Sequence, residues 1–144
     1  NDTQAKSMYF GGRLKSSNDA IEELSARGVD ITIPYTDNLL LRSTQSPEVQ
    51  KLMNQKRDFF TAVTRRETGA NMPDKELREA DLLYFPQPGE PPELVAQKAQ
   101  KRKLATELMI AEVPAEHRKK LESLIRESKQ TPTNINDLLK KYAP

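Results

Sequence analysis

Glu67 has the neighbours most suggestive of catalysis in this 144-residue chain. It stands before Thr68 and Gly69, a small hydroxyl residue and a glycine near the expected end of a helix. A glutamate whose pKa is raised can protonate a glycosidic oxygen and so cleave a sugar chain such as peptidoglycan. The sequence therefore offers one candidate for general acid catalysis.

The order Glu67, Thr68, Gly69 resembles the Glu-Ser motif of lytic transglycosylases. The resemblance covers three residues, and the chain lacks both the Gly-Leu-Met-Gln segment that follows in those enzymes and the aromatic residues of a sugar cleft. The other interpretation is a helix that ends at Gly69, because glycine is frequent just after the last helical turn. We favour the helix end and keep peptidoglycan cleavage through Glu67 as an alternative function.

His117 is the single histidine, and it lies in the charged run 116–120. Catalysis or metal binding would need a nucleophile or a further ligand beside it, yet the chain has no cysteine and no other histidine. A histidine on a solvated helix face is the simpler interpretation. Neither a glycine-rich phosphate-binding loop nor the ligand spacing of a zinc site occurs. We therefore expect no catalytic residue, no cofactor and no metal.

A short basic run gives the second kind of candidate, because closely spaced cations can follow the phosphates of DNA. Acidic residues at 93, 107 and 112 dilute this run, and the formal net charge is only +2, from 23 basic and 21 acidic residues. DNA contact stays an alternative function. The candidate DNA-contact residues are Lys98, Lys101, Arg102 and Lys103.

The composition limits the core that can position such residues. Only 35% of the residues are apolar and 31% are charged, with a mean hydropathy of −0.78, whereas a compact domain is nearer half apolar. Ten prolines against five glycines indicate helices separated by turns, with sparse packing between them. No apolar run approaches the ~20 residues of a membrane span, so we expect none. Because residue 1 is Asn, we expect the chain to be a piece of a longer protein.

The first expected helix occupies residues 1–28 and is followed by an extended arm over 29–45. Apolar residues recur at steps of three and four along the helix, and Gly28 ends it. Apolar residues alternate over 29–35, but Pro34 cannot donate to a sheet, so this segment is expected as an arm. The apolar residues of the helix and the arm are Phe10, Leu14, Ile21, Leu24, Ile31, Ile33, Tyr35, Leu39 and Leu40.

A helical hairpin is expected over 46–84, with Ser46 as its cap and Pro47 at the first helical position. Four prolines and a glycine between residues 86 and 92 exclude helix and impose a stiff course. We expect this proline elbow, residues 85–92, to redirect the chain while Phe85 is anchored in an apolar pocket.

Helices are expected again over 93–144, with breaks near 113 and 130–134. The last of them carries apolar residues at helical spacing, among them Leu138 and Tyr142. The apolar residues of the first helix, of the arm and of this last helix together give more apolar surface than one small core needs. Exposed apolar surface of that extent is typical of protein contacts. We therefore expect all of these residues, together with Phe85, to take part in self-assembly.

Two segments resemble a pattern shared by many virion proteins of tailed phages and prophages. Residues 60–73 read FTAVTRRETGANMP and residues 84–90 read YFPQPGE. The family has an Ala-Val-x-Arg-(Arg/Lys)-Glu-Ser-Gly-Ala segment and then Tyr-Phe-Pro-Gln-Pro-Gly-Asp. Its next run, of Pro-Glu-Val-Ile-Ala-Gln-Lys-Ala type, corresponds to PELVAQKA at 92–99, with Arg102 close behind. The resemblance covers roughly residues 5–105, most specifically 60–102, with Thr68 and Glu90 as small departures.

The resemblance implies a structural component of the phage particle, an internal or DNA-ejection protein or a tail-associated one, without catalytic residues. Such a protein would reside in the virion and, if an ejection protein, be delivered toward the host cell envelope. We expect an all-α fold of extended, proline-kinked helices with a sparse core and one arm. We expect it to assemble as a homo-oligomer, a ring near the portal and tail, in contact with portal or tail components.

Overall fold

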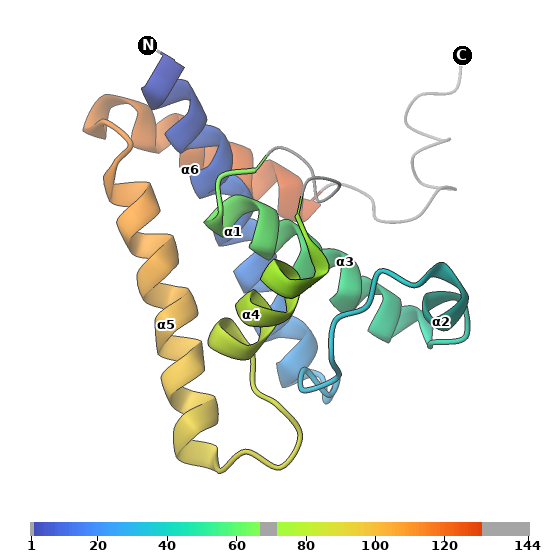
Figure 1. Ribbon diagram of the computed structural model, residues 1–144. Coiled ribbons are helices and arrows are strands. Elements are labelled where there is room, and N and C mark those ends of the chain that lie inside the picture. Colours follow the sequence, from blue (N-terminus) through green and yellow to red (C-terminus); the bar gives the residue numbers. More distant parts are fainter. Residues whose placement is uncertain (1, 67–71, 131–144) are drawn as a thin grey trace, which may run out of the picture.

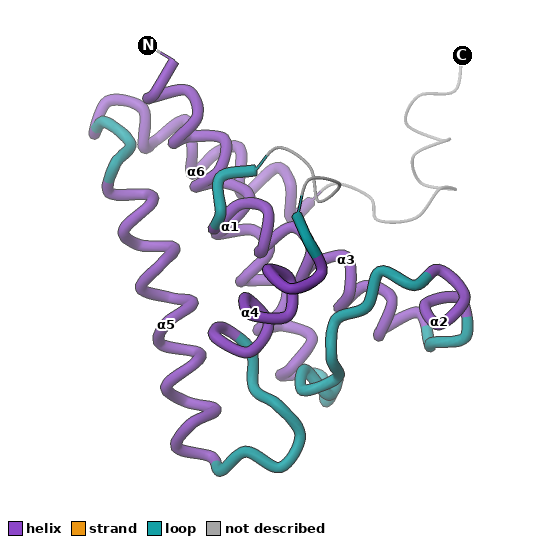
Figure 2. The backbone as a smooth tube through the Cα atoms, viewed as in Figure 1, coloured by secondary structure: helices purple, strands orange, loops and turns teal. Residues whose placement is uncertain are grey.

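The helix α1 (Asp2–Ala26) lies at the centre of the packing in the computed structural model, which describes residues 2–66 and 72–130. It packs against α3, α5 and α6, and α4 packs against α3 and α5. Every regular element in the described residues is a helix, which confirms the all-α prediction (Figures 1 and 2). The other helices are α2 (Leu39–Ser43), α3 (Pro47–Val63), α4 (Asp74–Tyr84), α5 (Pro92–Ala111) and α6 (Ala115–Gln130).

The helix starts and ends follow local signals in most places. Ser46 caps α3 by accepting a hydrogen bond from the Val49 N–H at 3.3 Å, and Pro47 is its first residue. Gly28 follows α1 with a φ of +92°, a conformation that glycine adopts without strain. The loop between α4 and α5 coincides with the proline elbow.

The end of α3 differs from the expected closure at Gly69. The helix stops at Val63, and Arg65 takes a left-handed conformation with a φ of 57°. The Arg66 N–H then donates to the Thr61 carbonyl at 2.7 Å, which satisfies a carbonyl of the last turn. The prediction was wrong because a non-glycine residue adopts the terminating conformation here.

Most of the buried apolar residues form one core cluster. Its buried side chains come from α1, α3, α4, the proline elbow, the 29–38 segment and α5. The apolar residues of α1 and those over 29–35 of the expected arm, predicted as separate surfaces, lie in or against this one core. The close packing of α5 on α1 helps to form it, because a Cβ added to Gly11 would lie only 3.6 Å from Ile110 Cγ1.

The expected arm is an irregular segment that leads into the short helix α2. Ile31 is buried, and Ile33 and Tyr35 are half-buried against the core. Asn38 caps α2 by accepting hydrogen bonds from the N–H groups of residues 40 and 41. The prediction of a continuous extended arm is therefore wrong over 39–43. Leu40 lies on α2 with 79% of its surface exposed.

Within the described residues, no helix combines the length and apolar character needed to cross a membrane.

Candidate functional site

A buried ion pair joins α3 to α4. Lys56 Nζ lies 3.0 Å from Asp81 Oδ1 and donates to the Ile33 carbonyl at 2.9 Å, and the Lys56 side chain is fully buried. The other carboxylate oxygen of Asp81 accepts a hydrogen bond from the Tyr35 N–H at 3.2 Å. Burial lowers the pKa of Lys56, and the attraction of Asp81 opposes that shift. The pair therefore fastens the 29–38 segment onto two helices.

Arg102 is a second buried cation, on α5. Its guanidinium donates to the Tyr84 carbonyl at 2.7 Å, to Asn18 Oδ1 at 3.1 Å and to Glu22 Oε1 at 2.6 Å. Because Asn18 and Glu22 lie on α1 and Tyr84 ends α4, one side chain connects three helices. These hydrogen bonds offset the free-energy cost of removing the charge from water.

Lys98 holds the proline elbow one turn earlier on α5. Its Nζ donates to the Phe85 carbonyl at 3.1 Å and to both carboxylate oxygens of Glu90 at 2.9 Å. Glu90 also accepts the Gln87 N–H at 2.7 Å, and the Gln87 amide donates to the carbonyls of Asp81 and Phe85. The hydrogen bond from Lys98, aided by that from the Gln87 N–H, lowers the pKa of Glu90.

The ring of Phe85 lies among these charges and is fully buried. Lys56 Nζ is 4.7 Å and Arg102 Cζ is 5.0 Å from the ring centre, distances at which a cation interacts with an aromatic face. The rings of Phe59 and Phe60 pack against it nearly at right angles, with centres 5.4 and 5.6 Å away. We call the set Lys56, Asp81, Phe85, Gln87, Glu90, Lys98 and Arg102 the Phe85 junction.

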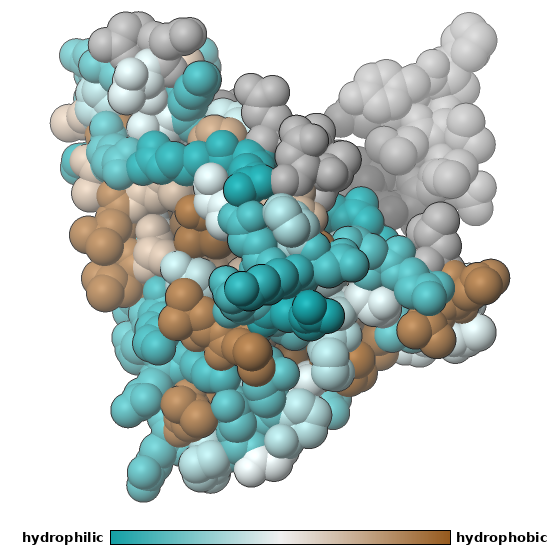
Figure 3. All heavy atoms as spheres, in the orientation of Figure 1, coloured by the Kyte–Doolittle hydropathy of each residue, from teal (hydrophilic) through white to brown (hydrophobic). Residues whose placement is uncertain are grey.

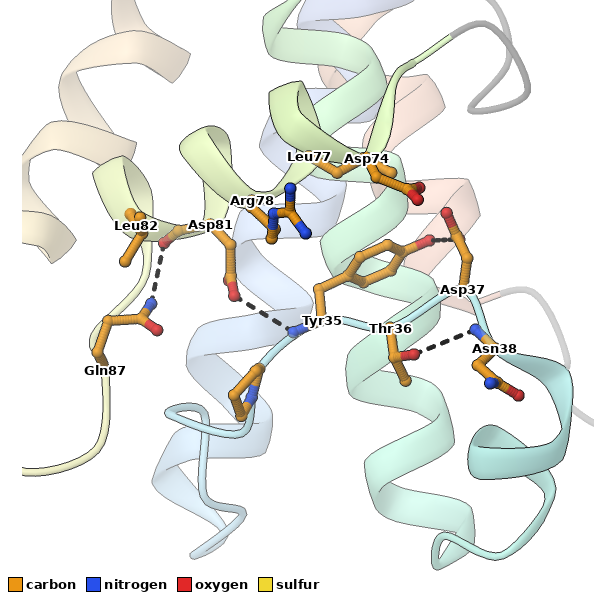
Figure 4. Close-up of a pocket in the computed structure, with 11 residues that line it drawn as sticks. Tyr35, Thr36, Asp37, Asn38, Asp74, Leu77, Arg78, Asp81, Leu82 and Gln87 are labelled. Atoms are coloured by element: carbon orange, nitrogen blue, oxygen red, sulfur yellow. Dashed lines mark hydrogen bonds between the residues drawn. The ribbon is translucent and has the colours of Figure 1, made fainter.

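A groove of about 450 Å³ opens beside the junction, between the 34–38 segment and α4 (Figure 4). The Tyr35 hydroxyl donates to Asp37 and accepts from Arg57 Nε at 3.2 Å, and burial raises the pKa of Tyr35. Asp81 is occupied by Lys56 and the Tyr35 N–H. In this groove Tyr35, Asp37 and Asp81 are therefore engaged with groups of their own chain.

The described residues hold no cluster of three or more His, Asp or Glu side chains arranged for a metal ion. Glu67, the candidate general acid, lies outside the described residues, as do Leu138 and Tyr142 of the last expected helix. His117 is half-buried beside Glu116 on α6, its Nε2 3.6 Å from Glu116 Oε1.

The four candidate DNA-contact residues separate into two pairs. Lys101 and Lys103 are exposed, but Lys98 and Arg102 are buried in the Phe85 junction. The expectation of one basic surface made by all four residues is therefore corrected. The reason is that the aliphatic stems of Lys98 and Arg102 cross the core, where carboxylates and carbonyls meet their charged ends.

Most of the residues expected to form self-assembly contacts lie inside the chain's own core, which corrects that assignment. Their apolar surface is covered by neighbouring helices, so they present no free stripe to a partner. Those buried are Phe10, Leu14, Ile21, Leu24, Ile31 and Phe85, while Ile33 and Tyr35 are half-buried. Leu40 remains exposed, and Leu39 is the first residue of α2.

Other leucines form the exposed apolar surface. Figure 3 shows hydrophobic side chains over α2, α4 and α5. Leu104 and Leu108 face away from the buried residues Lys98 and Arg102 of α5. The sequence did not indicate this, because Lys98 and Arg102 look like solvated cations there. The large exposed side chains here include Leu41, Leu82, Leu83, Leu104 and Leu108.

Comparisons of the chain with models of known protein families, with curated proteins and with solved structures found no match.

Proposed function

We propose that this chain is a structural component of a tailed-phage particle, an internal, DNA-ejection or tail-associated protein that acts through protein contacts. The resemblance of residues 60–102 to virion proteins is the starting point. One structural observation supports a non-enzymatic interpretation of it: the elbow and α5 segments of that resemblance are used to build the Phe85 junction.

The contacts of the Phe85 junction account for the residue types at 84–90 and for the spacing of the cations on α5. In the segment YFPQPGE, Phe85 fills the core, Gln87 bonds two carbonyls and Glu90 pairs with Lys98. In the segment that follows, Lys98 and Arg102 point back onto the elbow. These contacts hold α4 and α5 at one angle, and they engage the charged ends of Glu90, Lys98 and Arg102 within the chain. A rigid bent connector is suited to a mechanical role.

The partners proposed are further copies of this chain, arranged as a ring, and portal or tail components. The exposed leucines of α2, α4 and α5 support protein contacts of this kind, because a partner that covers large apolar side chains removes them from water. Lys101 and Lys103 are the two candidate DNA-contact residues that remain on the surface.

The test is the composition and activity of the particles of the phage or prophage that carries this gene. We expect the chain in purified, DNA-filled particles, detected by mass spectrometry. Deletion should give particles that fail to assemble fully or to deliver DNA, and the wild-type gene supplied in trans should restore delivery. Absence of the chain from purified particles would overturn the proposal.

A matched variant separates the structural role from peptidoglycan cleavage. Glu67→Gln keeps the size of the side chain and removes its acid. We expect this variant to restore DNA delivery as well as the wild type does, and neither protein to lyse purified cell wall. Lysis of the cell wall by the wild type, but not by Glu67→Gln, would instead favour a peptidoglycan-cleaving enzyme.

A further inference from the structure

The helices of this chain contribute unequally to its core. The helix α3 buries side chains along most of its length, from Leu52 to Ala62. Among the described side chains of α6, by contrast, Leu121 is the only buried one, and Ile125 is half-buried. Leu121 also lies outside the core cluster, whose residues come from α1, α3, α4, α5 and the segments between them. The helix α6 is therefore attached to the core rather than part of it.

The attachment of α6 is mainly to one helix, α1. Gly12 marks the point where the two helices cross, since a Cβ added there would lie 3.2 Å from Leu121 Cδ1. Figure 1 shows α6 at the end of the molecule where α1 begins, away from the elbow between α4 and α5. A helix held mainly through one crossing can detach without disturbing the packing of the other helices.

The turn between α5 and α6 joins a firmly held helix end to a weakly held one. On the α5 side, Glu112 accepts hydrogen bonds from Arg65, at the end of α3, and from Ser7 of α1, at 3.3 Å. On the α6 side, Arg118 donates to the Val113 carbonyl at 3.1 Å. The Arg118 side chain is exposed, so water can replace this hydrogen bond at little cost in free energy.

We propose that α6 opens from α1 as a unit, by rotation about the turn at residues 112–114, while α1 to α5 stay folded. Opening separates Leu121 from Gly12 and uncovers a strip of α1. The core cluster and the Phe85 junction stay intact, because no described residue of α6 belongs to either of them. A local opening of this kind needs less free energy than unfolding of the whole chain.

The helix that moves carries charge on its outer surface. Arg118, Lys119 and Lys120 are exposed on α6, so opening changes the position of three consecutive cations relative to a fixed body. The inference does not rest on the proposed function, because it concerns the isolated chain. In a particle, it would give an otherwise rigid connector one movable element.

The experiment is amide hydrogen exchange of the full 144-residue chain, followed by NMR under native conditions. We compare residues 119–125 in α6 with residues 52–60 in α3, both inside helices. After correction for intrinsic rates, we expect the α6 amides to exchange about tenfold faster or more, because they exchange through the opening and the α3 amides through global unfolding.

Ile21→Val tests whether α6 opens separately. Ile21 is fully buried on α1 and belongs to the core cluster, nine residues beyond the crossing at Gly12. The closed and open forms both keep this core, so the lost methylene group should destabilise both equally relative to the unfolded chain. We expect exchange in α3 to become about threefold faster or more, and exchange in α6 to keep its wild-type rate.

Gly12→Leu tests the crossing itself. The added side chain would occupy the place of Leu121, because even a Cβ at this position lies 3.2 Å from Leu121 Cδ1. We expect the α6 amides to lose their protection while those of α3 stay protected. Glu23→Leu places the same side chain at an exposed position of α1, and it should leave exchange in α6 unchanged.

Equal acceleration of exchange in α3 and α6 by Ile21→Val would overturn the inference, because the chain would then unfold as one unit. It would also be overturned by an α6 that stays protected in Gly12→Leu, or by loss of every helix in that variant, measured by circular dichroism. None of these measurements uses a particle, so failure of the opening and failure of the proposed function can be told apart.

Discussion

The guanidinium carbon of Arg102 lies 5.0 Å from the centre of the Phe85 ring. This contact joins the middle of α5 to the first residue after α4, and the same arginine continues to Asn18 and Glu22 on α1. Lys56 approaches the ring as well, at 4.7 Å. A single aromatic side chain therefore serves both as core filling and as the partner of two buried cations.

Phe85→Ala should lower the free energy of unfolding by about 3–5 kcal/mol, because it leaves a cavity where the ring was fully buried. Phe85→Leu refills most of that volume but leaves Arg102 and Lys56 without the ring, so its loss should be smaller, about 1–3 kcal/mol. Chemical denaturation of the three proteins measures both differences. Equal losses for the two variants would contradict the predicted contribution of the cavity, because leucine refills most of the volume that alanine leaves empty.

Lys56→Met should cost about 3–5 kcal/mol of unfolding free energy, because it leaves the Asp81 carboxylate buried without its cation. Asp81→Asn should also destabilise the fold, since Lys56 then loses its counter-charge. In a double-mutant cycle the combined variant should lose less than the sum of the single losses, by about 1 kcal/mol or more.

The exposed pair Lys75–Glu79 supplies the control for this cycle. Lys75→Met removes an ion pair whose two side chains are mostly in solvent, so its effect should stay within about 0.5 kcal/mol. Additive losses for Lys56 and Asp81 would contradict the coupling of the buried pair.

A helix boundary could be predicted from the sequence where a single residue type sets it through its own backbone conformation or hydrogen bond. Ser46 and Pro47 mark the start of α3 through hydrogen bonding and a fixed φ, and Gly28 follows α1 because it tolerates a positive φ. The end of α3 was not predictable in this way. Arg65 takes the left-handed conformation without the residue type that usually indicates it.

The core and the candidate site depended on contacts far apart in the sequence. Arg102 looks like a solvated cation within the run 101–103, and only its contact with Glu22, on another helix, explains its burial. Likewise the α1 stripe looked unpartnered until α3 and α5 were placed against it. Helical periodicity predicts that a face is apolar, but which element covers that face is set by the three-dimensional packing.

Glu90 should give the protein a measurable loss of stability in acid. Because Lys98 and the Gln87 N–H lower its folded-state pKa, folding favours the ionised carboxylate. The stabilisation is complete above the unfolded-state pKa of about 4.3 and is lost as the pH falls through the lower folded-state value.

Glu90→Gln removes this titration. Its melting temperature should lie below that of the wild type at pH 7, and the difference should narrow as the pH falls below about 4. Thermal melts of both proteins between pH 7 and 3 test this. A difference in melting temperature that stays constant from pH 7 to pH 3 would rule out the Lys98–Glu90 pair as its cause.

Gly11 should tolerate one added methyl group and no more. A Cβ at this position would meet Ile110 Cγ1 at 3.6 Å, an ordinary van der Waals distance, and α1 is continuous through it. Gly11→Ala should therefore raise the free energy of unfolding by about 0.5–1 kcal/mol, the usual difference between alanine and glycine inside a helix. Gly11→Leu should lower it by about 1–3 kcal/mol, because the longer side chain would push α5 away from α1. Chemical denaturation measures the change in the free energy of unfolding for both variants. A leucine variant as stable as the wild type would mean that α1 and α5 do not pack this closely.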